Sequence, residues 1–246
     1  MAGSNKVALV VERDFRTFFS DRFLLVVMFV NFLIDLGVSG LSLSAMIKGY
    51  GNYFLYIAPG ANLITATVAA FQSGRDIWRE RIIHDTHPYL LMLPFSKNGF
   101  ALSRLLSGML RTTVMVIPGT IVIGLLYHLS LPLFGVGMGI VFIYSAAVCG
   151  LSVTFASVAN SLELFATIRS TVQVYLSFFS TQFYPTSILP PAFLAVSTFN
   201  PMTWAVQSFR ALQNGTVDLG LLLPLAALST ALMLTGFLFY RRTMEF

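Results

Sequence analysis

The sequence predicts an all-α protein that crosses a membrane several times, as a single transmembrane domain over residues 1–246. The first observation is composition: 56% of the residues are hydrophobic and only 10% are charged, whereas soluble domains carry about 25% charged residues. The second is that the hydrophobic residues form runs of about 20, the length that crosses a bilayer as a helix. The third is that lysine and arginine fall almost entirely between alternate runs, as in membrane proteins of fixed orientation.

The first element is an amphipathic helix over residues 4–22. At about 100° per residue, Val7, Val11 and Phe15 share one arc and Arg16 lies opposite. A span begins directly afterwards, which favours an interfacial helix lying along the cytoplasmic leaflet. The alternative is a soluble helix that packs on the core.

Six runs follow that can cross the membrane. Asp35 is an acid within the first run, and Arg111 lies near enough to one end of the third to reach the headgroups. The expected spans are Phe23–Leu43, Tyr53–Ser73, Leu105–Tyr127, Leu133–Ala159, about Ser170–Tyr184 and Leu219–Tyr240.

The charge-free run Ser170–Phe209 is too long for one crossing and contains four prolines. Two crossings would place a turn in lipid, where each unsatisfied backbone group costs several kcal/mol. We therefore expect one span and then a re-entrant helical hairpin over residues 185–215, which enters the membrane without crossing it. A short helix over Ala192–Thr198 and a second one that starts at Pro201, capped by Asn200, would form this hairpin.

Orientation follows from the basic residues. With the N- and C-termini in the cytoplasm, only Lys48 and Arg210 of the 15 lysines and arginines lie outside. The net charge of +5 then reflects topology, and we expect no nucleic-acid partner. The inner set is Lys6, Arg13, Arg16, Arg22, Arg75, Arg79, Arg81, Lys97, Arg104, Arg111, Arg169, Arg241 and Arg242.

The cytoplasmic loop, residues 74–104, carries the clearest candidate for a protein contact. A charged stretch is followed by the apolar patch Tyr89–Leu93, which Pro88 and Pro94 flank. Exposed apolar patches mark interaction surfaces, although the patch can equally fold back on the spans. In the same loop His84, Asp85 and His87 are weak evidence for a metal site, and we expect a solvated loop with no metal.

With these features the chain resembles the membrane (permease) subunit of ATP-binding-cassette type-2 exporters, over nearly its whole length. Three stretches carry the resemblance. They are Phe54–Gly60 (FLYIAPG); the loop with Arg79-Glu80-Arg81, Thr86, Tyr89-Leu90-Leu91, Pro94 and Ser96-Lys97; and Tyr184-Pro185, Leu189-Pro190-Pro191, Asn200-Pro201-Met202-Thr203 and Arg210-Ala211-Leu212. The loop departs from the family at Ile83-His84-Asp85 and at Pro88.

The resemblance implies an ATP-driven exporter in a prokaryotic cytoplasmic membrane. Two permease subunits, identical or related, would pair above two copies of an ATP-binding subunit that carries ATP and Mg²⁺, and this chain would bind no cofactor and catalyse no reaction. The implied ATPase-coupling residues are Arg79, Glu80, Arg81, Thr86, Pro88, Tyr89, Leu90, Leu91, Met92, Leu93 and Pro94. The implied outer gate is Tyr184, Pro185, Pro190, Pro191, Asn200 and Pro201.

A substrate path is marked only weakly. Intramembrane acids are functional candidates, which singles out Asp35, and Phe178, Phe179 and Phe183 cluster near the end of the fifth span. The alternatives for these residues are helix contacts and core packing. Other functions remain open: a secondary transporter driven by an ion gradient, although no internal repeat is present, and a non-transporting membrane scaffold.

Overall fold

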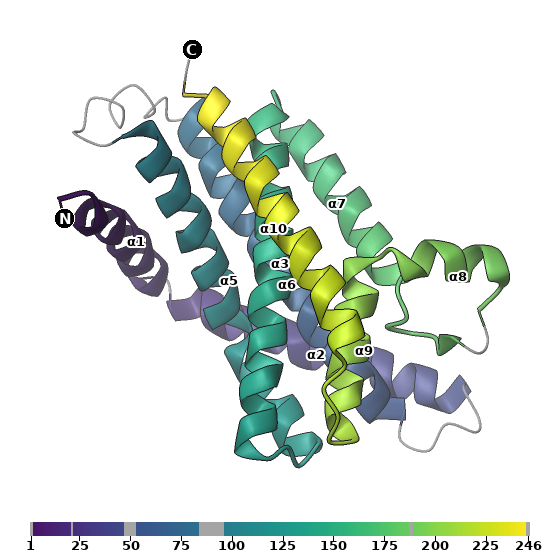
Figure 1. Ribbon diagram of the computed structural model, residues 1–246. Helices are drawn as coiled ribbons and strands as arrows, with labels where there is room; N and C mark the ends of the chain where they lie inside the picture. Colours follow the sequence, from purple (N-terminus) through teal and green to yellow (C-terminus); the bar gives the residue numbers. More distant parts are fainter. Residues whose placement is uncertain (1, 21, 47–52, 84–95, 187–188, 245–246) are drawn as a thin grey trace.

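The computed structural model describes residues 2–20, 22–46, 53–83, 96–186 and 189–244. These residues form helices, and none of them lies in a strand. In Figure 1 the long helices α3, α5, α6 and α10 stand side by side, in agreement with their mutual contacts. The helices are α1 (Ala2–Ser20), α2 (Arg22–Met46), α3 (Tyr53–Ile82), α5 (Lys97–Leu126), α6 (Leu131–Val158), α7 (Leu162–Phe178), α8 (Pro191–Thr198), α9 (Pro201–Gln213) and α10 (Leu219–Arg242).

Within the described residues five helices, α2, α3, α5, α6 and α10, are long and apolar enough to cross a membrane. They coincide with five of the six expected spans. Two of them are longer than predicted, because α3 continues to Ile82 and α5 begins at Lys97. Both helices therefore enter the segment that the sequence assigned to the cytoplasmic loop.

The fifth expected span was placed wrongly along the chain. The helix there, α7, runs from Leu162 to Phe178 and not from Ser170 to Tyr184. Its early start has a local cause, since the side chain of Ser161 accepts a hydrogen bond from the backbone N–H of Leu164 and caps the helix. With 17 residues, α7 is about 25 Å long, shorter than a bilayer core of about 30 Å, so the six-span count stays a prediction.

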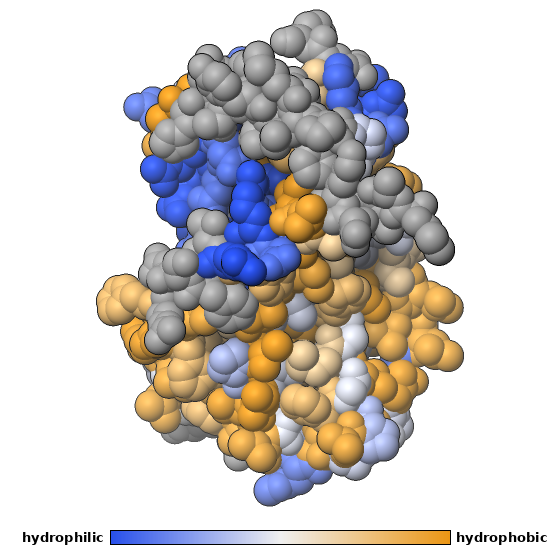
Figure 2. Space-filling model, turned by 90° about the vertical axis from the view of Figure 1, so that its left-hand side faces the viewer, coloured by the Kyte–Doolittle hydropathy of each residue, from blue (hydrophilic) through white to orange (hydrophobic). Residues whose placement is uncertain are grey.

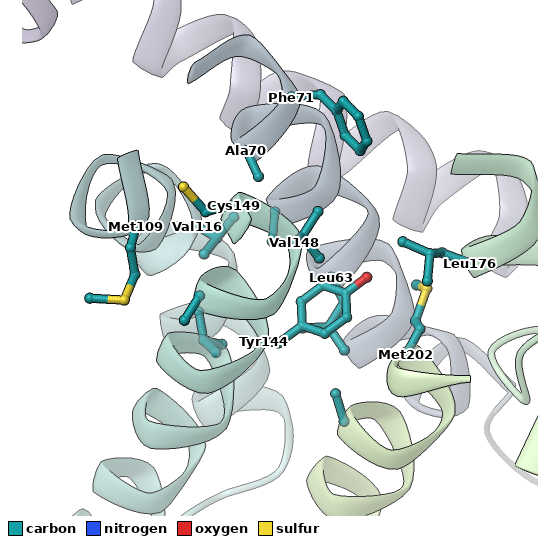
Figure 3. Close-up of a cluster of buried hydrophobic side chains, with 14 of the residues drawn as sticks. Leu63, Ala70, Phe71, Met109, Val116, Tyr144, Val148, Cys149, Leu176 and Met202 are labelled. Carbon is teal, nitrogen blue, oxygen red and sulfur yellow. The ribbon is translucent and has the colours of Figure 1, made fainter. Parts of the chain in front are cut away.

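The core lies between α3 and α6, where Figure 3 shows buried side chains of both helices gathered together, among them Leu63 and Tyr144. Small residues let the helix backbones approach closely: a Cβ on Gly74 would lie 2.1 Å from Oγ of Ser152. Polar side chains join the helices across this core. Oγ1 of Thr67 lies 2.8 Å from the hydroxyl of Tyr144, and Nδ2 of Asn62 donates to Oγ1 of Thr120 at 2.9 Å, both in buried surroundings.

The N-terminal helix is confirmed as a separate element. Helix α1 packs on α5, and Val10 on its apolar side is buried while Glu12, Arg13 and Arg16 on the other side are exposed. Its packing on α5 shows that α1 belongs to the folded body. Its position along a leaflet stays a prediction.

The proline-rich segment also folds as two short helices, as predicted. Helix α8 starts at Pro191 and α9 starts at Pro201, whose N-cap Asn200 accepts a hydrogen bond from the N–H of Met202. Helix α9 packs against α3, α6 and α10, whereas α8 touches mainly α9 and projects from the bundle (Figure 1). The depth of this pair in a membrane stays a prediction.

Candidate functional site

Charged side chains gather at one end of the bundle, which we call the basic end: Arg13, Asp14, Arg75, Asp76, Arg79, Glu80, Arg104 and Arg111. They come from α1, α3 and α5 and line a cleft of about 590 Å³. Figure 2 shows hydrophilic residues collected in the upper part of the molecule, above a surface that is mostly hydrophobic. The boundary between the two zones is the one expected where a bilayer core gives way to headgroups.

Arg104 is the centre of the basic end. Its guanidinium Nη1 lies 2.7 Å from Oδ2 of Asp14 in α1, and its Nη2 pairs with Oε2 of Glu80 in α3. The Arg104 side chain is 7% exposed, and a buried charge of this kind needs partners. One arginine on α5 therefore holds α1 and the last turns of α3 together.

A second ion pair joins the same two long helices, α3 and α5, farther from the basic end's outer edge than the pair of Arg104 and Glu80. Nη1 of Arg111 in α5 is 2.7 Å from Oδ2 of Asp76 in α3. The sequence places Arg111 within reach of headgroups, and the structure adds a protein partner that sequence reasoning missed. Helices α3 and α5 are thus joined at two levels by pairs of opposite charge.

The last turn of α3 is also fixed to the connection between α6 and α7. The indole Nε1 of Trp78 donates to the carbonyl of Ala159 at 3.0 Å. The guanidinium of Arg81 donates to the same carbonyl at 2.6 Å and also to the carbonyl of Ser157. These carbonyls end α6, where no further helical N–H can reach them, so α3 supplies their donors.

The predicted coupling residues are divided between described and undescribed parts of the chain. Arg79 is exposed, and Glu80 and Arg81 make the contacts given above. The other members, Thr86 and Pro88 to Pro94, lie outside the described residues. Glu80 and the two arginines lie in the last turn of α3, whereas the sequence placed them in the cytoplasmic loop.

At the opposite end of α3, Pro59 lies inside the helix. Proline has no N–H, so the carbonyl four residues earlier, that of Leu55, loses its helical donor. The hydroxyl of Tyr127, at the end of α5, donates to this carbonyl at 2.9 Å. In the same turn Arg210 of α9 donates to the carbonyl of Tyr56 through Nε at 3.2 Å and Nη2 at 3.0 Å.

Arg210 also holds the irregular segment that follows α7. Its Nη1 donates to the carbonyl of Thr181 at 2.9 Å, and its Nη2 donates to that of Gln182 at 3.0 Å. The guanidinium carbon lies 3.4 Å from the centre of the Tyr56 ring, a cation–π contact. One side chain thus ties α3, α9 and residues 181–182 together, and we call this set of bonds the Arg210 contact.

Glycine makes this close approach possible. A Cβ on Gly60 would lie 2.2 Å from Cγ of Gln182, so a side chain at position 60 would displace the segment that the Arg210 contact holds. The Pro-Gly pair of the FLYIAPG stretch therefore has two separate structural roles. Pro59 leaves the Leu55 carbonyl open to Tyr127, and Gly60 provides space for Gln182.

The six predicted outer-gate residues occupy different surroundings. Asn200 is buried, and its Nδ2 donates to the carbonyls of Tyr175 and Leu176 at 3.2 Å each, so it joins α9 to the end of α7. Pro185 and Pro201 are also buried. The remaining three, Tyr184, Pro190 and Pro191, are exposed.

Three of the four predicted substrate-path residues line one cleft. Asp35 of α2, Phe178 of α7 and Phe183 contribute to a cavity of about 460 Å³ between α2, α3 and α7. Phe179 is not part of it, because its ring stacks on Phe193 of α8 with the ring centres 4.8 Å apart. Polar groups from α2 and α7, among them Asn31, line the same cleft.

Sequence reasoning missed the pairings of Asp14, Asp76, Trp78, Arg104 and Tyr127. Each of these residues joins helices far apart in the chain, so no local sequence pattern identifies its partner. Charged residues near the ends of neighbouring spans need a counter-charge. The sequence therefore indicates that Asp76 and Arg111 need partners, but it does not show that they pair with each other.

The Tyr127 bond gives a direct test of the open carbonyl. We expect Tyr127→Phe to destabilise the protein by about 1–2 kcal/mol, because the buried carbonyl of Leu55 loses its donor. The measurement is thermal unfolding of the purified protein in detergent. The matched control is Tyr175→Phe, since Tyr175 is 38% exposed and its hydroxyl makes no hydrogen bond within the described residues. Equal midpoints for the two variants would show that the bond contributes nothing.

A family model described as "ABC-2 type transporter" matches residues 5–214, which include the basic end and the Arg210 contact. No curated protein matches the chain.

Proposed function

We propose that this chain, which belongs to the ABC-2 type transporter family, is the membrane subunit of an exporter powered by a separate ATP-binding subunit. The family identifies a multi-pass transmembrane component of an ABC transporter, a class whose membrane subunits work with an ATP-binding partner. The sequence contains no GxxxxGK[ST] phosphate loop. ATP and Mg²⁺ would therefore be bound by the partner, in two copies, beneath a pair of permease subunits.

The observation that carries the proposal is the connection of α3 to other helices at both of its ends. Near the loop, Glu80 joins α3 to Arg104 of α5, and Arg81 joins it to the α6–α7 connection. At the other end, the Arg210 contact joins it to α9 and the segment after α7. A displacement of the loop would thus move α3 together with its neighbours as a rigid body.

In this proposal the segment 83–96 receives the motion of the ATPase, and residues 185–215 respond to it. Helices α8 and α9 suit a gate, because irregular backbone at membrane depth is tolerated where it is buried in protein or lines a cavity. The cleft lined by Asp35, Phe178 and Phe183 would form part of the substrate path. The orientation, with both termini in a prokaryotic cytoplasm, is the one that the basic residues favour.

Co-purification in mild detergent tests the proposal. We expect an ATP-binding subunit to purify with the full chain. Leu90→Asp should reduce its recovery by tenfold or more, because the apolar patch Tyr89–Leu93 would bind an apolar groove of that subunit, and an acid is costly to bury there without a counter-charge. The control is Asn98→Asp, which adds the same acid at an exposed position in the first turn of α5, outside the apolar patch Tyr89–Leu93, and should leave recovery within twofold. Export from liposomes that proceeds with no ATPase present, driven by an ion gradient, would contradict the proposal.

A further inference from the structure

Asp35 is a carboxylate without a protein partner. It lies within the apolar helix Phe23–Ser42, and it makes no hydrogen bond or ion pair with any residue that the structure describes. An acid at membrane depth is costly unless it is paired or faces a cavity that holds water or a ligand. Asp35 faces such a cavity, since it lines the cleft between α2, α3 and α7.

Among the residues that the structure describes, no cation lines the cleft beside Asp35. Helix α7 carries a single cation, Arg169, whose charged neighbour is Arg75, and Arg75 lies 3.8 Å from Asp76 at the basic end. Arg210 donates its hydrogen bonds to backbone carbonyls.

The rest of the cleft is suited to an amphipathic ligand. Phe178, 55% exposed, packs on Phe183 with ring centres 5.6 Å apart, and aromatic rings attract organic cations. Asn31 and Gln173 face the same space with amides that make no side-chain hydrogen bond within the described part of the chain. A volume of about 460 Å³ is within the range of small-molecule sites.

We infer that this cleft binds an amphipathic organic cation, with Asp35 as its counter-charge and Phe178 and Phe183 as its apolar contacts. The inference rests on the proposed function, for which it names the substrate class. Asp35 is the only charged residue among those that line the cleft. A neutral molecule of the same shape would leave this carboxylate unpaired and would bind more weakly.

The test is equilibrium binding to the full chain, purified with its ATP-binding partner in nanodiscs, with two probes of similar shape. Methyltriphenylphosphonium is a cation and triphenylphosphine oxide is neutral, and both carry three phenyl groups and one small substituent on phosphorus. We expect the cation to bind at least tenfold more tightly than the neutral probe. Asp35→Asn should weaken binding of the cation by tenfold or more and leave the neutral probe within twofold, since only the charge is removed.

Three variants keep this test decisive. Asp218→Asn is the matched control, because Asp218 caps α10 by accepting from the N–H of Gly220, a role that asparagine retains, and both probes should bind within twofold of the parent. Asp35→Glu should keep cation binding within about threefold. If Asp35→Asn fails to fold, Asp35→Ser with the same two probes gives the comparison.

The inference is overturned if the two probes bind the parent protein equally, or if Asp35→Asn binds the cation as tightly as the parent does. The proposed function has a separate readout in the same preparation, namely the presence of the ATP-binding subunit and its hydrolysis of ATP. Loss of charge selectivity with ATP hydrolysis intact rejects the inference alone. Charge-selective binding with no ATPase present rejects the proposed function alone.

Discussion

Replacing Gly150 by valine is expected to lower the unfolding midpoint by about 6–12 °C, corresponding to about 3 kcal/mol. Helices α6 and α10 share the largest helix–helix interface of the described chain, and Gly150 lies where their backbones meet. A Cβ at this position would lie 2.4 Å from the carbonyl oxygen of Leu232 and 2.7 Å from the backbone nitrogen of Met233. Because these atoms are backbone, no side-chain rotation relieves the clash.

The matched control is Gly139→Val in the same helix, where a Cβ meets no atom within 4 Å. We expect its midpoint within about 2 °C of the parent, since Gly139 is only partly buried and a substitution into open space changes stability by about 0.5 kcal/mol or less. Thermal unfolding followed by size-exclusion chromatography in detergent measures both variants. A Gly150→Val protein as stable as Gly139→Val would mean that α6 and α10 do not pack in the described arrangement.

Arg104→Met is expected to destabilise the protein by about 3 kcal/mol, because it removes the buried cation that binds both Asp14 and Glu80. Asp14 keeps its second ion pair, with Arg13 at 2.8 Å. The side chains of Asp14 and Glu80 are 13% and 29% exposed, so water can solvate them only in part. Since the same arginine joins α1 to α3, we also expect α1 to become accessible to protease. Limited proteolysis together with thermal unfolding measures both effects.

Lys97→Met removes a positive charge from the same helix, α5, at an exposed position, and we expect a change below about 0.5 kcal/mol. A partial rescue separates charge from shape. Adding Asp14→Asn and Glu80→Gln to Arg104→Met should recover about half of the loss, because neutral amides are less costly to bury than carboxylates. If Arg104→Met behaves like Lys97→Met, the ion pairs of the basic end contribute nothing to stability.

The sequence was sufficient for most of the helical layout, because the signals involved are local. Runs of apolar residues predicted six spans, five of which are membrane-length helices in the described structure, and the helical periodicity of residues 4–22 predicted α1. Asn200 and Pro201 predicted the start of α9, where cap and proline act on adjacent residues. The start of α7 was missed because the expected span was drawn only over the charge-free run that begins at Ser170. Helix α7 instead begins after its cap at Ser161 and includes Glu163 and Arg169.

The contacts between helices could not be predicted, because they join residues that are far apart in the sequence. Arg104 meets Asp14 from 90 positions away, and Arg210 meets Tyr56 from 154 positions away. Composition shows that such charges need partners at membrane depth, but only the packing decides which ones. Asp35, Phe178 and Phe183 were named from the sequence as part of a substrate path, and the structure brings them to one cleft. Phe179 lies apart from them on Phe193 of α8, and the substrate path itself stays a prediction.

Pro59 has a consequence for how sequences of this family vary. Its missing N–H makes the hydroxyl of Tyr127 necessary as a substitute donor for Leu55. A homologue with any other residue at the position of Pro59 regains the backbone donor, and its equivalent of Tyr127 is released to become phenylalanine or leucine. The two positions should therefore covary across an alignment of homologues, although 68 residues separate them in the chain.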